Sequence, residues 1–218
     1  MNNPVDRIID NIPANLFRNL LEQMDAAFSK AVKFTGEKFQ PPEKTFMLGQ
    51  ARHAFCEEGF RAAAENVGLN AVSATTEPVG GRYSLIRHQG IHLIRGNIQV
   101  HCGPPRATRF RKEWALVNSW IDPLQLDLFS SVPEPSSDKL CAMLVVSADK
   151  KSGDSSLPAF VGLGIPHSDL SSWAFLEPLS KLLGRYNYAE TNSHTQEVAE
   201  IGIKDLAIPR LKNRSRTD

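Results

Sequence analysis

Residues 83–94 read Tyr-Ser-Leu-Ile-Arg-His-Gln-Gly-Ile-His-Leu-Ile and mark the point where the pattern changes from helical to β. The two apolar runs, residues 83–86 and 91–94, have the length and side-chain types of short strands. Between them lies the polar segment His88-Gln89-Gly90, which ends in a glycine and is typical of a tight turn. This stretch therefore predicts a β-hairpin in the middle of the chain.

Upstream of the hairpin, apolar residues recur at helical spacing. A first helix is predicted after Pro13, which suits a first helical turn, and it fades near Gly36. A second helix is predicted over about 49–67, with Gly68 at its left-handed C-cap. The apolar positions of the first helix are Leu16, Phe17, Leu20, Leu21, Met24, Ala27, Phe28, Ala31 and Val32.

Downstream, the pattern alternates between strand and helix signals. Residues 98–102 alternate as a half-buried strand does, and residues 106–121 favour a helix with Phe110, Trp114 and Val117 on one face. Two apolar runs, 140–146 and 160–165, predict a second hairpin.

The last predicted element is a helix over about 171–183, which Pro178 bends or splits. The order of elements predicts an α+β protein with two N-terminal helices, a small antiparallel sheet, a linker rich in proline and serine, a hairpin and a C-terminal helix. The corresponding regions are 1–121, the linker 122–138, a hairpin and helix on the same core at 139–200, and a basic tail at 201–218.

The amino-acid composition excludes several classes of function for this chain. The chain has 218 residues, 41% of them hydrophobic, and a formal net charge of +1, so we expect a folded core and no general attraction to nucleic acid or membrane. The three cysteines, Cys56, Cys102 and Cys141, are far apart and form no CxxC pair, which argues against disulfides and a structural zinc site. We expect no cofactor, no signal peptide, no membrane span and a cytoplasmic location.

The linker carries an unusual set of apolar residues. Residues 122–138 contain three prolines and four serines, which is typical of an exposed connection. Nevertheless Leu126, Leu128 and Phe129 lie within it. Large apolar side chains in such a segment indicate docking onto a partner, or else packing back onto the protein's own core.

These residues carry a resemblance. Residues 125–129, Gln-Leu-Asp-Leu-Phe, resemble at all five positions the pentapeptide by which bacterial polymerases, repair proteins and replication regulators bind the replication sliding clamp. The resemblance implies that the partner is the DNA polymerase III beta sliding clamp. It also implies a role for each residue: Gln125 is a polar anchor, Leu128 and Phe129 fill the main cleft, Leu126 covers its edge and Asp127 faces outward.

The length of the chain limits which class of clamp-binding protein it can belong to. A polymerase needs a much longer chain, and a regulatory ATPase needs a phosphate loop ending in Gly-Lys-Ser/Thr, which this sequence lacks. An adaptor or competitor without a catalytic centre fits better. The chain is similar in size and motif to the SocB-type bacterial toxins, which occupy the clamp. That resemblance implies a replication-blocking toxin with an antitoxin or proteolytic adaptor as a further partner.

A second hypothesis is an enzyme, such as a nuclease or repair factor tethered to the clamp. His88 and His92 have a spacing that suits metal ligands on a helix but not across a hairpin turn. Adjacent strand residues such as His101 and Cys102 point to opposite faces, which disfavours a nucleophile pair. The other candidates are Arg87, Arg95, Asp149 and Lys150.

A third hypothesis is direct nucleic-acid contact. Arg106, Arg109, Arg111 and Lys112 form a basic cluster that is suited to weak contact with DNA phosphates. The same cluster is equally compatible with a solvated helix face, and the basic end of the chain with a solubilising tail.

The first two predicted helices leave a further alternative open. Residues 23–28 vaguely resemble the clamp motif, although their helical spacing favours core packing. The apolar faces of the two helices could also bind a helix of an antitoxin or chaperone.

Overall fold

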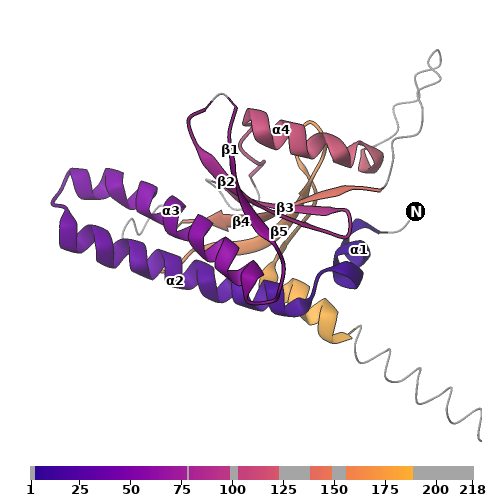
Figure 1. Ribbon diagram of the computed structural model, residues 1–218, viewed down its shortest axis with the longest axis horizontal. Helices are drawn as coiled ribbons and strands as arrows, with labels where there is room; N and C mark the ends of the chain where they lie inside the picture. Colours follow the sequence, from indigo (N-terminus) through magenta and orange to yellow (C-terminus); the bar gives the residue numbers. More distant parts are fainter. Residues whose placement is uncertain (1–2, 78, 99–102, 123–137, 149–155, 189–218) are drawn as a thin grey trace, which may run out of the picture. The chain divides into compact units, whose positions relative to one another are not determined.

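This computed structural model describes residues 3–77, 79–98, 103–122, 138–148 and 156–188. They form an α+β fold in which an N-terminal helical region precedes a six-stranded sheet (Figure 1). The helices are α1 (Pro4–Asn11), α2 (Ala14–Lys38), α3 (Glu43–Glu65) and α4 (Arg109–Ala115), and α4 continues as a 3-10 helix, η1 (Leu116–Ile121). The strands are β1 (Ala71–Thr75), β2 (Arg82–His88), β3 (Ile91–Asn97), β4 (Leu140–Ser147), β5 (Phe160–Pro166) and β6 (Trp173–Pro178).

The two predicted N-terminal helices are confirmed as α2 and α3, which pack against each other as an antiparallel pair. Their contact is close at Gly59, where an added Cβ would lie 3.1 Å from Cβ of Gln23. Met24 and Phe28 are buried, as the core interpretation of residues 23–28 predicted. Gly68 has the predicted positive φ, 74°, after the end of α3.

The strands of the sheet lie in chain order, from β1 to β6. Neighbouring strands are antiparallel except β3 and β4, which are parallel. The predicted hairpin over 83–94 is confirmed as β2 and β3. Its two turn residues, Gln89 and Gly90, have φ of 47° and 74°, and two positive φ angles match the right-handed twist of the flanking strands.

The sheet is covered on both faces. Figure 1 shows α2 and α3 on one side of it and α4 on the other. Every residue of β4 is buried, which explains its uninterrupted apolar sequence. The core on the α4 side consists of Leu85, Ile94, Ile98, Ala115, Cys141, Met143, Val145, Phe160 and Leu170.

The prediction of a helix over 171–183 is wrong in its first half, because residues 173–178 form β6. Trp173 lies over Gly164 of β5, where an added Cβ would be 2.4 Å from the indole ring. This packing against a glycine far away in the sequence favours the strand over the local helical spacing. Residues 179–183 then begin a helix, directly after Pro178.

Three further features of the structure differ from the predictions. Helix α1 has no counterpart among them, and α3 begins at Glu43 rather than near Gly49. Of the strand predicted over 98–102, Ile98 follows the end of β3 and the other residues lie outside the described ones.

The chain divides into two units, residues 1–183 and 184–218. In the second unit, the described residues 184–188 are helical. Among the described residues, no helix has both the length and the apolar character needed to cross a membrane.

Candidate functional site

The clamp motif, residues 125–129, lies outside the described residues, which stop at 122 and resume at 138. The structure does describe both ends of the connection that carries it. One end is Asp122, directly after η1, and the other is the pair Asp138 and Lys139, directly before β4.

The first end is held by side-chain hydrogen bonds to the segment between β5 and β6. The Asp122 carboxylate accepts from the backbone N–H of Ser168 at 3.2 Å and from the Ser168 hydroxyl. It also lies 2.9 Å from Nδ1 of His167. These contacts fix the position of the residue that precedes the connection.

The second end is tied back to the same region. The indole N–H of Trp120, two residues before Asp122, donates to the carbonyl of Lys139 at 2.9 Å. The guanidinium of Arg7 donates to the carbonyl of Asp138, beside the β2–β3 turn at Gly90. The two ends of the connection are therefore close to each other, at one end of the sheet.

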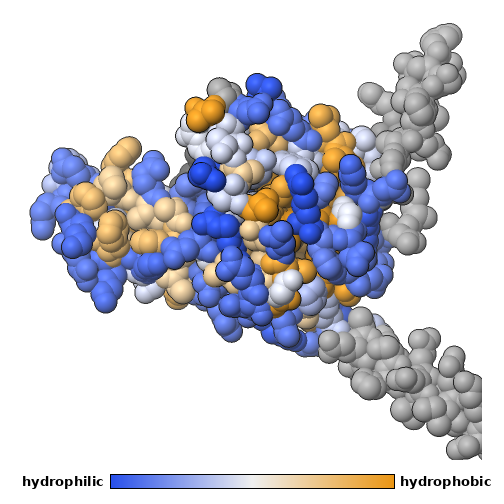
Figure 2. Space-filling view, viewed as in Figure 1, coloured by the Kyte–Doolittle hydropathy of each residue, from blue (hydrophilic) through white to orange (hydrophobic). Residues whose placement is uncertain are grey.

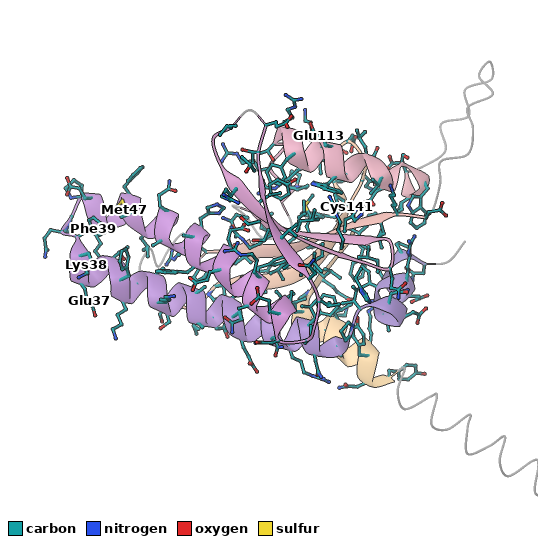
Figure 3. All side chains as sticks on the ribbon, in the orientation of Figure 1. Glu37, Lys38, Phe39, Met47, Glu113 and Cys141 are labelled. Carbon is teal, nitrogen blue, oxygen red and sulfur yellow. The ribbon has the colours of Figure 1, made fainter. Side chains whose placement is uncertain are left out.

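The four basic candidates do not share one solvent-exposed face. Arg106, Arg109 and Lys112 are exposed, and Arg109 pairs with Glu113 at 3.0 Å. Arg111 is half-buried and points toward the sheet, where an added Cβ on Gly96 would lie 4.0 Å from its Nε. Three members of the cluster are thus solvated, whereas Arg111 packs between α4 and the sheet. Figure 3 shows Glu113 on α4.

The two histidines of the enzyme hypothesis that the structure describes, His88 and His92, are not brought together. His92 pairs across the β2–β3 ladder with Arg87 and shares its face, whereas His88, next to Arg87, points to the opposite face. The His92 ring contacts Trp114 edge-to-face, and burial, with Arg87 and Lys139 nearby, lowers its pKa. His101, Cys102, Asp149 and Lys150 lie outside the described residues.

The cysteines that the structure describes are buried thiols. Cys56 lies in α3 and Cys141 in β4, and both are free. Burial raises the pKa of Cys141 to about 12, so its thiol stays protonated and unreactive. Figure 3 shows Cys141 within the sheet.

A buried ionic network that the sequence pattern did not predict joins α3 to the β2–β3 pair. Glu57 accepts from Nε of Arg95 at 2.9 Å and from the backbone N–H of Ser84 at 2.7 Å. Arg95 also bonds to Asn97 and lies 2.6 Å from Nδ1 of His53. Burial and the charge of Arg95 lower the pKa of His53, which keeps its ring neutral and able to accept from Arg95.

This network had a weak signal in the sequence. Glu57 lies four residues after His53 and three before Phe60, so it occupies the core-facing stripe of α3. A carboxylate on such a stripe requires a buried partner. The partner, Arg95, is on a strand, and helical spacing alone does not identify it.

Core packing accounts for most of the apolar residues of the α2–α3 hairpin. At its free end, however, Phe46 is 71% exposed and Phe34 is 39% exposed. Phe34 contacts Phe39 and Phe55 edge-to-face. Figure 2 shows apolar surface along this hairpin, and Figure 3 places Phe39 and Met47 at its free end.

Within the described ranges, no three His, Cys, Asp or Glu side chains gather in a way that could hold a metal ion. Comparison with protein-family models, curated proteins and solved structures gives no match to this chain.

Proposed function

We propose that this protein binds the bacterial DNA polymerase III beta sliding clamp through residues 125–129 and thereby blocks or modulates replication in the cytoplasm. The observation that carries the proposal is the match of Gln-Leu-Asp-Leu-Phe to the clamp-binding pentapeptide. The cleft on the clamp is shared by its partners, so a bound competitor excludes the polymerase. By the same resemblance, the protein acts as the toxin of a toxin–antitoxin pair.

The contacts at the two ends of the connection support presentation of the motif to a partner. Asp122 is fixed to Ser168 and His167, and Lys139 is fixed to Trp120. The chain covers at most about 3.5 Å per residue, so the six residues from Asp122 to Leu128 span up to roughly 20 Å. That length is sufficient for the anchors to reach a groove on a partner while the host fold stays outside it.

Recognition of this kind depends on a few large side chains. Leu128 and Phe129 supply apolar area, and Gln125 supplies directional hydrogen bonds that set the register. Pro123 and Pro133 restrict the chain on both sides, which lowers the entropic cost of binding. Because the anchors are apolar, the affinity should depend only weakly on salt.

The test is the binding of the full-length protein to the purified clamp, for wild type and a Leu128→Ala/Phe129→Ala variant. We expect micromolar or tighter binding for wild type and a loss of about 100-fold or more for the variant, because each anchor is worth about 2 kcal/mol or more. The matched control is Asp127→Ala, which changes the residue that faces outward and should alter the affinity about twofold or less.

Absence of wild-type binding, or equal affinity for wild type and the double variant, would refute the docking proposal. If docking is confirmed, expression of wild type in bacteria should slow DNA synthesis, whereas expression of the double variant should not. This second measurement separates a replication block from simple clamp binding.

A further inference from the structure

Three polar residues of α3 at four-residue spacing, His53, Glu57 and Arg61, contact the β2–β3 pair. This spacing places them on one face of the helix. His53 and Glu57 both contact Arg95 of β3. The guanidinium of Arg61 donates to the hydroxyl of Ser84 on β2 at 2.7 Å. His53 is the member of this row nearest to the free end of the α2–α3 hairpin, which extends beyond the sheet in Figure 1.

The contact between His53 and Arg95 requires a neutral histidine ring. Arg95 is buried, and each nitrogen of its guanidinium has an acceptor of its own. Nε donates to Glu57 at 2.9 Å, and Nη1 donates to the side chain of Asn97. Nη2 lies 2.6 Å from Nδ1 of His53. Because arginine can only donate, Nδ1 of His53 accepts this hydrogen bond, and the proton of the neutral ring is on Nε2.

Protonation of His53 removes this hydrogen bond. A protonated ring carries hydrogen on both nitrogens and cannot accept, and it places a second positive charge beside the guanidinium. His53 is an exposed residue, so its charged ring can turn toward solvent, whereas Arg95 stays buried. Nη2 of Arg95 would then be buried without its acceptor, which is energetically costly. Histidine is the side chain whose ordinary pKa places this change of charge between about pH 5 and pH 8.

The charged groups that act on His53 come from α3, β3 and α4. Desolvation of the ring and the positive charge of Arg95 on β3 lower its pKa from the ordinary value of 6.5. Glu57 on α3 acts in the opposite direction, and Arg111 on α4 adds to the lowering. A histidine whose pKa is lowered by folding contributes stability that is complete above its ordinary pKa and is lost as the pH falls through its folded pKa. The contact is therefore made at neutral pH and lost in acid.

We propose that His53 is a pH-sensitive contact, which holds the outer part of α3 on the sheet while its ring is neutral and releases that part when the ring is protonated. The hydrogen bonds of Glu57 and Arg61 to Ser84 do not involve the His53 ring, so the inner part of α3 stays in place. The buried apolar cluster on the outer side of His53 joins α2 to α3 and not to the sheet; its residues are Ala31, Leu48 and Ala51. The proposal is independent of clamp docking, which uses residues 125–129.

The test is amide hydrogen exchange of the full-length protein, measured by mass spectrometry at about pH 7.5 and about pH 5. The rates are expressed as protection factors, which correct for the intrinsic pH dependence of exchange. In wild type, the amides of residues 46–56, in the outer part of α3, should lose protection by about tenfold in acid. That factor is the order expected when one buried hydrogen bond to a charged group is lost. The amides of residues 60–65 should keep their protection within about threefold, because the inner contacts remain.

Two substitutions of His53 separate the hydrogen bond from the change of charge. His53→Asn places an amide oxygen near the position of Nδ1, where it can accept from Arg95 but does not titrate, and the two residues have similar helix propensity. Protection of residues 46–56 in this variant should agree within about twofold between the two pH values. His53→Ala has no acceptor, so its protection over these residues should be as low at neutral pH as that of wild type in acid.

The matched control is His88→Asn, which changes a histidine of β2 and should lose protection over residues 46–56 in acid as wild type does. His92, whose pKa burial also lowers, is kept in every variant, so any loss that it causes remains in His53→Asn and is not attributed to His53. The proposal is overturned if His53→Asn loses as much protection in acid as wild type. It is also overturned if His53→Ala is as protected as wild type at neutral pH, or if His88→Asn abolishes the loss.

Discussion

At the scale of single residues, the Glu57 carboxylate replaces a backbone hydrogen bond that β2 does not make to β3. The β2–β3 ladder runs from His88↔Ile91 to Leu85↔Ile94, and Ser84 is the next residue along β2. Its backbone N–H donates to the Glu57 carboxylate rather than to β3. The same carboxylate neutralises Arg95, which is 3% exposed. One helix side chain thus completes the hydrogen bonding where two strands separate.

This role predicts a large effect for Glu57→Gln. The amide keeps the size of the side chain but leaves the buried Arg95 charge unbalanced, so we expect the free energy of unfolding to fall by about 3–5 kcal/mol. Urea denaturation followed by circular dichroism measures the change.

The matched control for Glu57→Gln is the neighbouring residue. Glu58 pairs with Lys30 at 3.3 Å, with side chains that are 60% and 56% exposed. Glu58→Gln should therefore change the free energy of unfolding by at most about 1 kcal/mol. Equal losses in the two variants would show that the buried network does not contribute more than a surface pair.

At the scale of elements, Asn118 of η1 joins β4 to β5 where their ladder ends. The regular register of these strands begins at Met143↔Gly164, so Cys141 faces Pro166, which has no N–H to donate. The Asn118 amide donates to the carbonyls of Cys141 and Pro166 at 2.9 and 2.8 Å and accepts from Cys141 N–H at 2.8 Å. As with Glu57, a side chain supplies hydrogen bonds that the neighbouring strands do not make to each other at this point.

We expect Asn118→Leu to be strongly destabilising. The substitution leaves two or three buried backbone groups unpaired, at about 1–3 kcal/mol each, so the free energy of unfolding should fall by roughly 3–6 kcal/mol. Thermal and urea unfolding measure the loss. Asn118→Asp tests the cause, because it still accepts from Cys141 N–H but can no longer donate to the carbonyls, and it should also be destabilised.

Ser119→Ala is the control for the Asn118 variants, since Ser119 is the exposed neighbour in η1. A change within about 0.5 kcal/mol is expected there. Full stability of Asn118→Leu would mean that the protein tolerates the unpaired groups or that water replaces the amide.

At the scale of the first unit, residues 1–183, the parallel pair β3 and β4 joins two antiparallel hairpin systems into one sheet. Parallel neighbours need a long crossover, and here the crossover contains α4, η1 and the connection with the clamp motif. The contacts of Asp122 and Trp120 hold both ends of that connection near each other. The topology thus places the motif in a segment whose length the sheet does not restrict.

If anchoring of the connection assists docking, Asp122→Ala should weaken clamp binding by about two- to fivefold, because freeing one end increases the conformational entropy lost on binding. Titration of the clamp with wild type and the variant measures this effect. It presupposes that wild type binds the clamp. Asp169→Ala is the control, since Asp169 is exposed and caps the backbone N–H of Ser171 without contacting Asp122. Unchanged affinity of Asp122→Ala would show that the anchored end contributes nothing to docking.

The candidate sites differ in how far the sequence reveals them. The clamp motif is a contiguous pattern, so residues 125–129 alone suggest it. The arginine cluster is also contiguous in the sequence. Only the tertiary structure, however, shows that Arg111 is half-buried whereas Arg109 is exposed. The pairing of Glu57 with Arg95 spans 38 positions, and no local pattern relates the two residues.

The sequence by itself determined the α+β class, helices α2 and α3, the β2–β3 hairpin and the β4–β5 pair, because these depend on local periodicity and on turn residues such as Gly90. Tertiary structure decided that residues 173–178 are a strand, since Trp173 gains its packing from Gly164 on β5. It also decided the parallel joining of β3 to β4 and the partners of Glu57 and Asn118. These features depend on contacts between residues distant in the chain, whose energies exceed the local preferences that a sequence pattern records.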